Sequence, residues 1–446
     1  MTMTPRLFGT DGVRGKAGSY PLDHQTVRRL GAALVRALPE GHPRVLIGRD
    51  TRESGEWIER ELAHGARACG ADVMSAGVIP TPGVAYLTGS SDFTAGVVIS
   101  ASHNPFEDNG IKVFSGAGEK FTDDLERHVE SIVADTSWSV PEGEADAVPG
   151  ESLVNRYVGH LETIVADAGR LRGTRIALDC ANGATTRVAP RVFRELGFDV
   201  TTIGNEPDGR NINLECGSTH PQRLASLVVE RGLAFGVAFD GDGDRAIFVD
   251  ERGRIVDGDA VLLICGMQLK AEGRLRGDTV VATVMSNIGL ELALRAQNIA
   301  LLRCQVGDRY VKDEMVRHGY TLGGEQSGHV IFSDYLFTGD GLGTALQMVR
   351  VMLTTGRTLS DLAAQLTTYP QVLVNVRVRE RVDLKSVPAL EAVIRTVEGR
   401  LAGQGRLLVR YSGTEPLLRI MLEGQRESEI RTWAEEIAAA VKTHLA

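Results

Sequence analysis

Residues 236–249 read GVAFDGDGDRAIFV, an acidic loop between two short apolar runs. The runs GVAF and AIFV are typical of buried strands. The loop alternates three aspartates with two glycines, and the glycines let the chain curl so that the three carboxylates converge. We therefore expect two strands of one sheet, joined by a loop that binds a ligand.

Asp240, Asp242 and Asp244 are candidate ligands for one hard divalent cation, such as Mg²⁺ or Ca²⁺, because these ions prefer oxygen ligands. Three close carboxylates repel one another unless a cation joins them; a solvated acidic turn is the alternative. An EF-hand is excluded because Arg245 stands where that loop needs glycine. Arg245 beside the aspartates also suggests that the metal's other partner is an anion.

Apolar runs outside this region indicate an α/β fold, because amphipathic segments lie between many of them. The 446 residues are enough for two to four domains at about 150 residues each. A small, acidic, proline-containing stretch at residues 134–150 marks one boundary. The predicted domains, three with the same strand–loop–helix rhythm and a smaller C-terminal one, are residues 1–150, 151–253, 254–367 and 368–446.

The charge balance and the cysteines limit the partners and the compartment. The 49 Lys and Arg residues against 58 Asp and Glu give a net charge of −9, which disfavours nucleic acid or an anionic membrane as the main partner. The five cysteines are scattered without a CxxC pair, so we expect free thiols in a reducing compartment. The start MTMTPRLFGTDG has no apolar signal-peptide region, and no stretch approaches the roughly 18 apolar residues of a membrane span. We expect a cytoplasmic protein.

The sequence SASHNP, residues 100–105, follows the apolar run AGVVI directly. This places Ser100 and Ser102 at the carboxyl end of a strand, where α/β folds build their sites. The nucleophile elbow of hydrolases is excluded because its GxSxG pattern is missing; ordinary turn chemistry of Ser, Asn and Pro is the alternative. Lys112, in the strand-like IKVF, can return a positive charge to this loop.

The sequence GGEQSGH, residues 323–329, gathers polar groups in a flexible loop. The Glu325 carboxylate can accept hydrogen bonds from two neighbouring sugar hydroxyls, and Ser327 adds a hydroxyl of its own. His329 can move a proton near neutral pH, although a lone histidine is often structural. The loop therefore suits a polyhydroxylated ligand.

Two further loops combine glycine with arginine. Residues 8–15, FGTDGVRG, carry Arg14 in a glycine-rich turn that lacks the Walker pattern and is a weak signal alone. In the second loop, Arg410 and Arg419 lie on either side of YSGTEP, residues 411–416, between two expected strands. Backbone N–H groups, hydroxyls and guanidinium groups together can clamp a phosphate, whereas a plain hairpin is the alternative. The small residues of this candidate clamp are Ser412, Gly413 and Thr414.

Together and in this order, these loops resemble those of the α-D-phosphohexomutase superfamily over the full length of the chain. In that family SASHNP is the phosphoserine loop, DGDGDR the magnesium loop, GEQSGH the sugar loop and RYSGTEP the phosphate loop. The pairing of FGTDGVRG with NINLECGSTH (residues 211–220) and VGDRYV (residues 306–311) resembles the bacterial members that act on glucosamine phosphates.

The resemblance implies three related mixed α/β domains and a smaller C-terminal α+β domain around a central active-site cleft. It also implies an isomerase that interconverts glucosamine 6-phosphate and glucosamine 1-phosphate, on the route to UDP-N-acetylglucosamine and cell-wall precursors. Phospho-Ser102 would donate its phosphoryl group, and glucosamine 1,6-bisphosphate would turn around as the intermediate. One Mg²⁺ would be held by Asp240, Asp242, Asp244 and the phosphate on Ser102.

The resemblance also implies the remaining roles. Arg14, Lys112 and His329 would act in catalysis, and Arg245 would contact the transferred phosphate. Glu325 and Ser327 would bind the sugar, and the loop between Arg410 and Arg419 would bind the distal phosphate.

The sequence alone leaves other functions open. The nearer one is a phosphomannomutase/phosphoglucomutase, and one from another class is a non-enzymatic sugar-phosphate sensor. A phosphatase is disfavoured because a mutase must retain its phosphate. The expected partner is a small-molecule hexosamine phosphate, and we consider a homodimer.

Overall fold

The computed structural model describes residues 7–9, 11–39, 41–143, 145–150, 152–401, 403–412 and 416–445. The chain divides into two compact units, and each is described by itself. The first unit is Met1–Met285 with Leu301–Ala364, and the second is Ser286–Ala300 with Gln365–Ala446. The described residues form sheets of seven, five, four and three strands.

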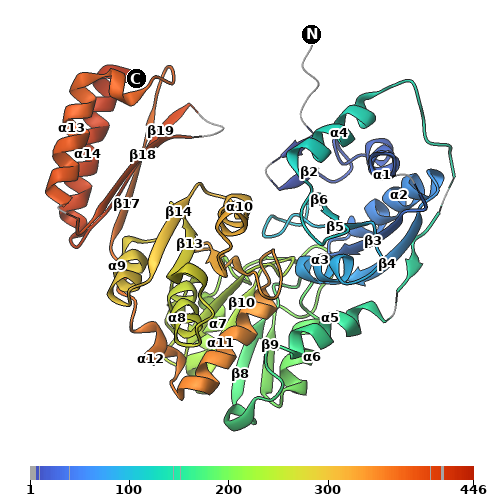
Figure 1. The fold of residues 1–446 in the computed structure, drawn as a ribbon, viewed down its shortest axis with the longest axis horizontal. Helices are drawn as coiled ribbons and strands as arrows, with labels where there is room; N and C mark the ends of the chain where they lie inside the picture. The colour runs from blue at the N-terminus through green and yellow to red at the C-terminus, as the bar shows by residue number, and fades with distance from the viewer. Residues whose placement is uncertain are drawn as a thin grey trace. The chain divides into compact units, whose positions relative to one another are not determined.

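The first sheet is mixed and lies between layers of helices. Its order is β1 (Phe8–Gly9), β2 (Gly12–Lys16), β6 (Asp108–Ser115), β5 (Ala95–Ile99), β3 (Arg44–Arg49), β4 (Asp72–Val78) and β7 (Val148–Pro149). Strands β3, β4 and β5 are parallel, whereas β6 is antiparallel to β5. Helices α1 (His24–Ala37) and α2 (Gly55–Ala68) pack together on one face, and α3 (Thr81–Gly89) covers the other (Figure 1).

Helix α4 (Asp123–Ala134) completes the layer beside α1, and the chain after it returns to the sheet. Strand β7 pairs with β4 there, so the acidic connection at residues 134–150 ends as an edge of the first sheet. The predicted domain boundaries stay a prediction.

The second and third sheets repeat the layered arrangement. The second has the order β12 (Ile255–Val256), β11 (Ala246–Asp250), β10 (Phe235–Phe239), β8 (Arg175–Asp179) and β9 (Asp199–Ile203). The third has the order β14 (Ala300–Cys304), β13 (Thr279–Thr283), β15 (Leu322–Gly324) and β16 (Val330–Phe332). Their helices are α5 (Leu153–Glu162), α6 (Val188–Glu195), α7 (Gln222–Arg231), α8 (Gly258–Ala271), α10 (Asp308–His318), α11 (Gly341–Thr355) and α12 (Leu359–Ala363).

Strands β10 and β11 are antiparallel neighbours, with Phe239 opposite Ala246. The loop DGDGDR is therefore the turn between them, and the predicted strand–loop–strand is confirmed. Strands β5, β10 and β15 each lie parallel to a neighbour in their own sheet. Residues 100, 240 and 325 directly follow these three strands, so each predicted loop begins at a strand's carboxyl end.

The second unit has a three-stranded antiparallel sheet in the order β17 (Gln371–Arg377), β19 (Leu417–Glu423) and β18 (Arg406–Tyr411). Helices α13 (Pro388–Leu401) and α14 (Glu427–Leu445) pack on it around a core of aliphatic side chains, and α9 (Ile288–Ala296) belongs to the same unit. The predicted class, three mixed α/β domains with a smaller α+β domain, is confirmed.

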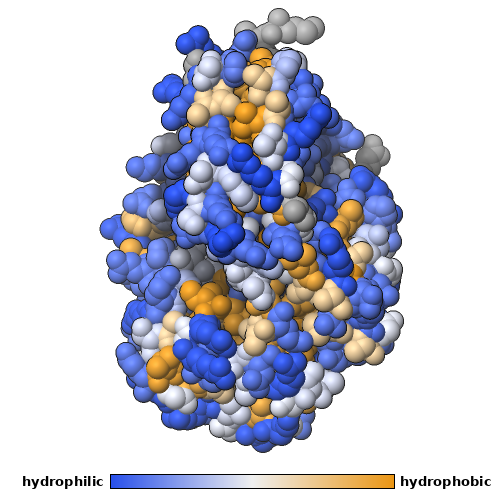
Figure 2. All heavy atoms as spheres, turned by 90° about the vertical axis from the view of Figure 1, so that its left-hand side faces the viewer, coloured by the Kyte–Doolittle hydropathy of each residue, from blue (hydrophilic) through white to orange (hydrophobic). Residues whose placement is uncertain are grey.

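The face in Figure 2 is mainly hydrophilic, with hydrophobic residues in separate patches. No helix within the described ranges is both long and apolar enough to cross a bilayer. All five cysteines are free, as predicted. Burial raises the pKa of Cys265 to about 12, so this thiol stays protonated and unreactive near neutral pH.

Candidate active site

A cavity of about 850 Å³ lies in the first unit where the predicted loops meet. Its volume is in the range of small-molecule sites. Its wall includes the predicted residues Arg14, Ser102, Asp244, Arg245, Glu325 and His329. The sequence VGDRYV contributes Val306 to Tyr310 and Asp123 also lines the cavity, so six separate segments of the chain converge on one space.

The three aspartates of the acidic loop form a tight cluster. Asp240, Asp242 and Asp244 are buried, and each offers one carboxylate oxygen within 4.8 Å of the others. Ser102 donates its hydroxyl hydrogen to Asp240 Oδ2 at 2.5 Å. Burial and the two neighbouring carboxylates raise the pKa of Asp240 well above its usual value, because a third negative charge is unfavourable here.

This cluster fits a hard divalent cation. Asp242 Oδ1 and Asp244 Oδ1 are buried and accept no hydrogen bond from the described residues. A buried carboxylate oxygen without a partner is costly, and a cation removes that cost. All the available ligand atoms are oxygens, which suit Mg²⁺. The cluster can therefore hold a metal ion.

Lys112 lies between the acidic loop and the N-terminal turn. Its Nζ is 2.9 Å from Asp242 Oδ2 and 3.1 Å from Asp11 Oδ2, and its side chain is 2% exposed. Burial opposes the charged ammonium, but the carboxylates of Asp11, Asp242 and Asp244 outweigh it and raise the pKa of Lys112 well above its usual value. The structure thus places a fixed positive charge beside Ser102's loop and the acidic cluster.

Two guanidinium groups reach the cavity from different loops. Arg14 pairs with Asp11, and its Nη1 is 3.5 Å from the carbonyl oxygen of Ala101. Arg245 donates its backbone N–H to Asp240 Oδ1, and its Nε is 3.8 Å from Asp244 Oδ1. Both side chains are partly exposed, which leaves them accessible to an anion at Ser102.

The sugar loop has three different environments. Glu325 lines the cavity, and its Oε1 accepts the N–H of Gly307 at 3.1 Å. Ser327 is exposed and does not line the cavity. His329 is buried; its Nε2 accepts the N–H of Gly339, so its Nδ1 carries the hydrogen and faces Asp244 Oδ2 at 3.5 Å. Burial opposes protonation of His329, but Asp244 reverses this effect and raises its pKa.

Three charged residues beside the cavity were not predicted from the sequence: Asp11, Lys120 and Asp308. Lys120 Nζ lies 2.6 Å from Asp11 Oδ1 and 2.5 Å from Asp308 Oδ2, so it joins the N-terminal turn to the start of α10. Asp11 belongs to FGTDGVRG and Asp308 to VGDRYV. A charged residue inside a glycine-containing turn is the signal that could have predicted them as site residues. Lys120 has no local signal, because its partners are more than 100 residues away.

The predicted phosphate loop belongs to the second unit. Arg410 and Arg419 lie directly opposite each other in the β18–β19 ladder and so share one face of the sheet. Two guanidinium groups on one face give this hairpin a local positive charge, which suits an anion. Ser412 is buried, and its carbonyl accepts a hydrogen bond from Arg381 at 2.7 Å. Gly413 and Thr414 lie outside the described residues.

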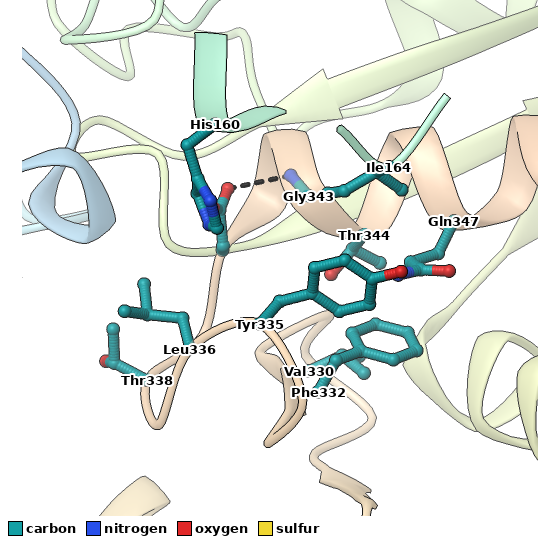
Figure 3. Close-up of a pocket in the computed structure, with 11 residues that line it drawn as sticks. His160, Ile164, Val330, Phe332, Tyr335, Leu336, Thr338, Gly343, Thr344 and Gln347 are labelled. Carbon is teal, nitrogen blue, oxygen red and sulfur yellow. Dashed lines mark hydrogen bonds between the residues drawn. The ribbon is translucent and has the colours of Figure 1, made fainter. Parts of the chain in front are cut away.

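A separate cavity of about 10 Å³ lies between the end of α5 and the start of α11 (Figure 3). Ile164, Phe332 and Tyr335 line it, so it is too small and too apolar for a sugar phosphate. Beside it, Tyr157 donates its hydroxyl to Asp340 Oδ2 at 3.0 Å. Burial raises the pKa of Asp340 to about 6.

Comparisons with known proteins agree with this geometry. The chain matches the phosphoglucomutase/phosphomannomutase models for alpha/beta/alpha domain I at residues 5–139, domain II at 155–253, domain III at 257–369 and the C-terminal domain at 373–440. It is 52% identical to a phosphoglucosamine mutase of Solibacter usitatus, covering 99% of this chain and 100% of that protein. It is 48% identical to one of Syntrophotalea carbinolica, covering 99% and 98%.

Solved structures share the fold. A phosphoglucomutase/phosphomannomutase family protein from Burkholderia thailandensis superposes with a TM-score of 0.81 at 23% identity, covering 99% of this chain and 98% of that one. An N-acetylphosphoglucosamine mutase from Aspergillus fumigatus, solved with GlcNAc-6P and magnesium, gives a TM-score of 0.66 at 18% identity, covering 98% and 95%.

Proposed function

The chain belongs to the phosphoglucomutase/phosphomannomutase family, and from its full-length similarity to phosphoglucosamine mutases we propose that it interconverts glucosamine 6-phosphate and glucosamine 1-phosphate. It is an isomerase that moves a phosphoryl group between two oxygens of one sugar. The observation that carries the proposal is the Ser102 hydroxyl, held 2.5 Å from Asp240 within the acidic cluster, beside a cavity of sugar size.

Phospho-Ser102 is the donor in this reaction. The bond between Ser102 Oγ and phosphorus breaks while a new bond forms between phosphorus and the free hydroxyl oxygen of the sugar, whose proton is lost. The resulting glucosamine 1,6-bisphosphate turns around and returns its other phosphoryl group to Ser102. Arg14 and Lys112 stabilise as cations the charge on the transferred group, and the proton from the sugar hydroxyl balances the released Ser102 Oγ, which becomes a hydroxyl again.

The acidic cluster would hold one Mg²⁺ through Asp240, Asp242 and Asp244, together with an oxygen of the Ser102 phosphate. When bound, such an ion neutralises negative charge that develops on the phosphoryl oxygens. Arg245 supplies a positive charge on the cavity side of the same loop. His329, the remaining candidate proton carrier, shares its Nδ1 hydrogen with Asp244.

The sugar and the distal phosphate are held by other residues. Glu325 binds sugar hydroxyls that occupy similar positions in both orientations. Ser327 was predicted to bind the sugar with it, but it does not line the cavity, so this proposal gives it no contact. The opposed arginines of the second unit support a phosphate clamp there. Its residues in this proposal are Arg410, Ser412, Gly413, Thr414 and Arg419. We also propose a cytoplasmic enzyme, active as a homodimer, that supplies the route to UDP-N-acetylglucosamine and cell-wall precursors.

Turnover of glucosamine, glucose and mannose 6-phosphates, measured side by side, tests the substrate. We expect the highest kcat/KM for glucosamine 6-phosphate. Equal or faster turnover of glucose or mannose 6-phosphate would instead identify a phosphoglucomutase/phosphomannomutase. Intact mass before and after phosphatase treatment should show one phosphate per chain. Absence of turnover, with or without that phosphate, would contradict the proposed mutase activity.

A further inference from the structure

The phosphoserine loop rests on a buried arginine that the mechanism does not use. The side chain of Arg52 is 0% exposed and pairs with Asp50, which directly follows β3. Its two Nη atoms donate to backbone carbonyls of the loop and of the start of β6, at Ser102, Asn104, Pro105 and Asp108. With Asp50 as the acceptor for Nε, each of the five guanidinium N–H groups has an acceptor.

A second residue reaches the same loop from the other side. Asn213 belongs to the sequence NINLECGSTH, a motif to which the mechanism assigns no role, and it lies between β9 and α7. Its Nδ2 donates to the carbonyl of Ser102 at 2.9 Å and to that of Asn104 at 3.2 Å. The carbonyl of Ser102 therefore receives one donor from Arg52 and another from Asn213.

Ser102 needs these contacts because its backbone is strained. Its φ of +52° lies in the left-handed region, which a residue with a Cβ seldom adopts. Its N–H donates to Ser100 Oγ at 3.0 Å, and Ser100 Oγ in turn donates to Asp50. Both polar backbone groups of Ser102 are thus fixed, and the hydroxyl of Ser100 is occupied in fixing them.

The acidic loop packs directly on this arrangement. A Cβ added at Gly241 would lie 2.5 Å from the carbonyl oxygen of Ser102 and 2.8 Å from Asn213 Nδ2. Only glycine allows so close an approach. Holding the carbonyl of Ser102 in place therefore also sets the distance from its Oγ to Asp240.

We propose that Arg52 and Asn213 are positioning residues that lock Ser102 in its strained conformation and so align its phosphoryl group for transfer. This inference rests on the proposed function. Neither residue lines the catalytic cavity, so their loss should slow phosphoryl transfer while sugar binding is largely kept. A lysine at position 52 would keep the charge, but it has only three N–H donors for five acceptors.

The decisive variant is Asn213→Gly. Asn213 itself has a φ of +59°, and glycine adopts this conformation without strain while removing both contacts to the loop. The matched control is Glu215→Gly, because Glu215 lies in the same motif, has a φ of +51°, is exposed and makes no contact with Ser102. Arg52→Lys is the second test variant.

The measurements are steady-state kcat and KM for both sugar phosphates, and the single-turnover rate at which the phosphorylated enzyme passes its phosphoryl group to glucosamine 1-phosphate. We expect Asn213→Gly and Arg52→Lys to lower kcat and the single-turnover rate by about 10- to 100-fold with KM changed less than about threefold. Glu215→Gly should behave as the wild type.

A wild-type kcat in Asn213→Gly, an effect on KM alone, or an equal loss in Glu215→Gly would overturn the proposal. If Arg52→Lys does not fold, Asn213→Gly decides the matter by itself. Absence of turnover in the wild type would contradict the proposed function instead, so the two failures are distinguishable.

Discussion

The phosphoserine loop and the C-terminal phosphate loop are both short runs of small residues beside a strand, yet they are held very differently. Ser102 follows a strand within a mixed sheet and is buried, and its N–H and carbonyl are both fixed by other side chains. Ser412 also is buried, but it belongs to a hairpin that includes the edge strand β18. In the same hairpin, Arg410 and Arg419 lie opposite each other in the β18–β19 ladder.

This difference matches two different tasks. Phosphoryl transfer from Ser102 demands one fixed geometry, because a displacement of about 1 Å can cost roughly 100-fold in rate. The proposed phosphate clamp must instead accept the 1-phosphate and the 6-phosphate alike. A cluster of positive charge on a hairpin can do this, since it recognises the phosphate and not the sugar around it.

Removing the serine that carries the phosphoryl group in the phosphoserine loop should have the largest effect. We expect Ser102→Ala to abolish nearly all mutase turnover, because the enzyme then lacks the hydroxyl that carries the phosphoryl group covalently. The fold should persist, as shown by an unchanged thermal melt. Phosphopeptide mapping of the wild type should place the phosphate on Ser102 and not on Ser100. Full activity of Ser102→Ala, or phosphate on Ser100 alone, would show that Ser102 does not carry the transferred phosphoryl group.

Metal removal should come next, because it affects the first loop and leaves the second unit untouched. Activity should vanish after exhaustive treatment with a chelator and return on addition of Mg²⁺. Asp242→Asn should raise the Mg²⁺ concentration needed for half-maximal activity, because one of the three carboxylates is lost. Undiminished turnover after all divalent metal has been removed would show that the acidic cluster has another role.

The two loops also differ in how far the sequence predicts them. The strands around DGDGDR follow from apolar runs and glycines within 14 residues, and the β10–β11 register confirms them. Arg52, by contrast, is one of 49 Lys and Arg residues, and no motif in the sequence around it predicts its role. Its carbonyl partners lie 50 to 56 residues further along the chain, so only the folded sheet reveals them.

The same reason explains the strain at Ser102 and the role of Arg381. Nothing in SASHNP signals a positive φ, because Ser102 is not glycine and its conformation is imposed by contacts from the segments after β3 and after β9. Arg381 lies after β17 and reaches Ser412 only once the second sheet has formed. Local motifs thus predict which groups react, whereas distant contacts hold them.

Arg419→Ala tests whether the clamp ignores the sugar. We expect both isomers to lose comparable transition-state stabilisation, about 1.5–3 kcal/mol for a charged hydrogen bond. Glu325→Ala should likewise reduce kcat/KM in both directions, and phosphate on Ser102 should persist in each variant. The control is Arg426→Ala in the same unit, where an exposed arginine pairs with Glu429. A loss confined to one isomer would show that the clamp recognises one end of the substrate.

The smallest effect concerns a buried carboxylate in each unit. Glu423 in the second unit accepts a hydrogen bond from Arg406 Nε at 2.8 Å. The donors to Asp340 in the first unit, among the described residues, are neutral: the Tyr157 hydroxyl and the backbone N–H groups of Leu342 and Gly343. Burial without a cation partner raises the pKa of Asp340 to about 6. The folded state therefore binds this proton more tightly than the unfolded state does, for which the usual value is 3.8.

The sign of the pH dependence follows from this shift. The contribution of Asp340 to stability is complete below about pH 4 and is lost as the pH rises through about 6. Asparagine can keep the helix cap of α11 but does not titrate, so Asp340→Asn should gain stability relative to the wild type, on the order of 1–3 kcal/mol, as the pH rises from 4 to 7. Thermal midpoints of Asp340→Asn and the wild type, measured across this range, check it. A constant difference between Asp340→Asn and the wild type at every pH would mean that the folded and unfolded states bind this proton equally, and that burial leaves the pKa of Asp340 at its usual value of 3.8.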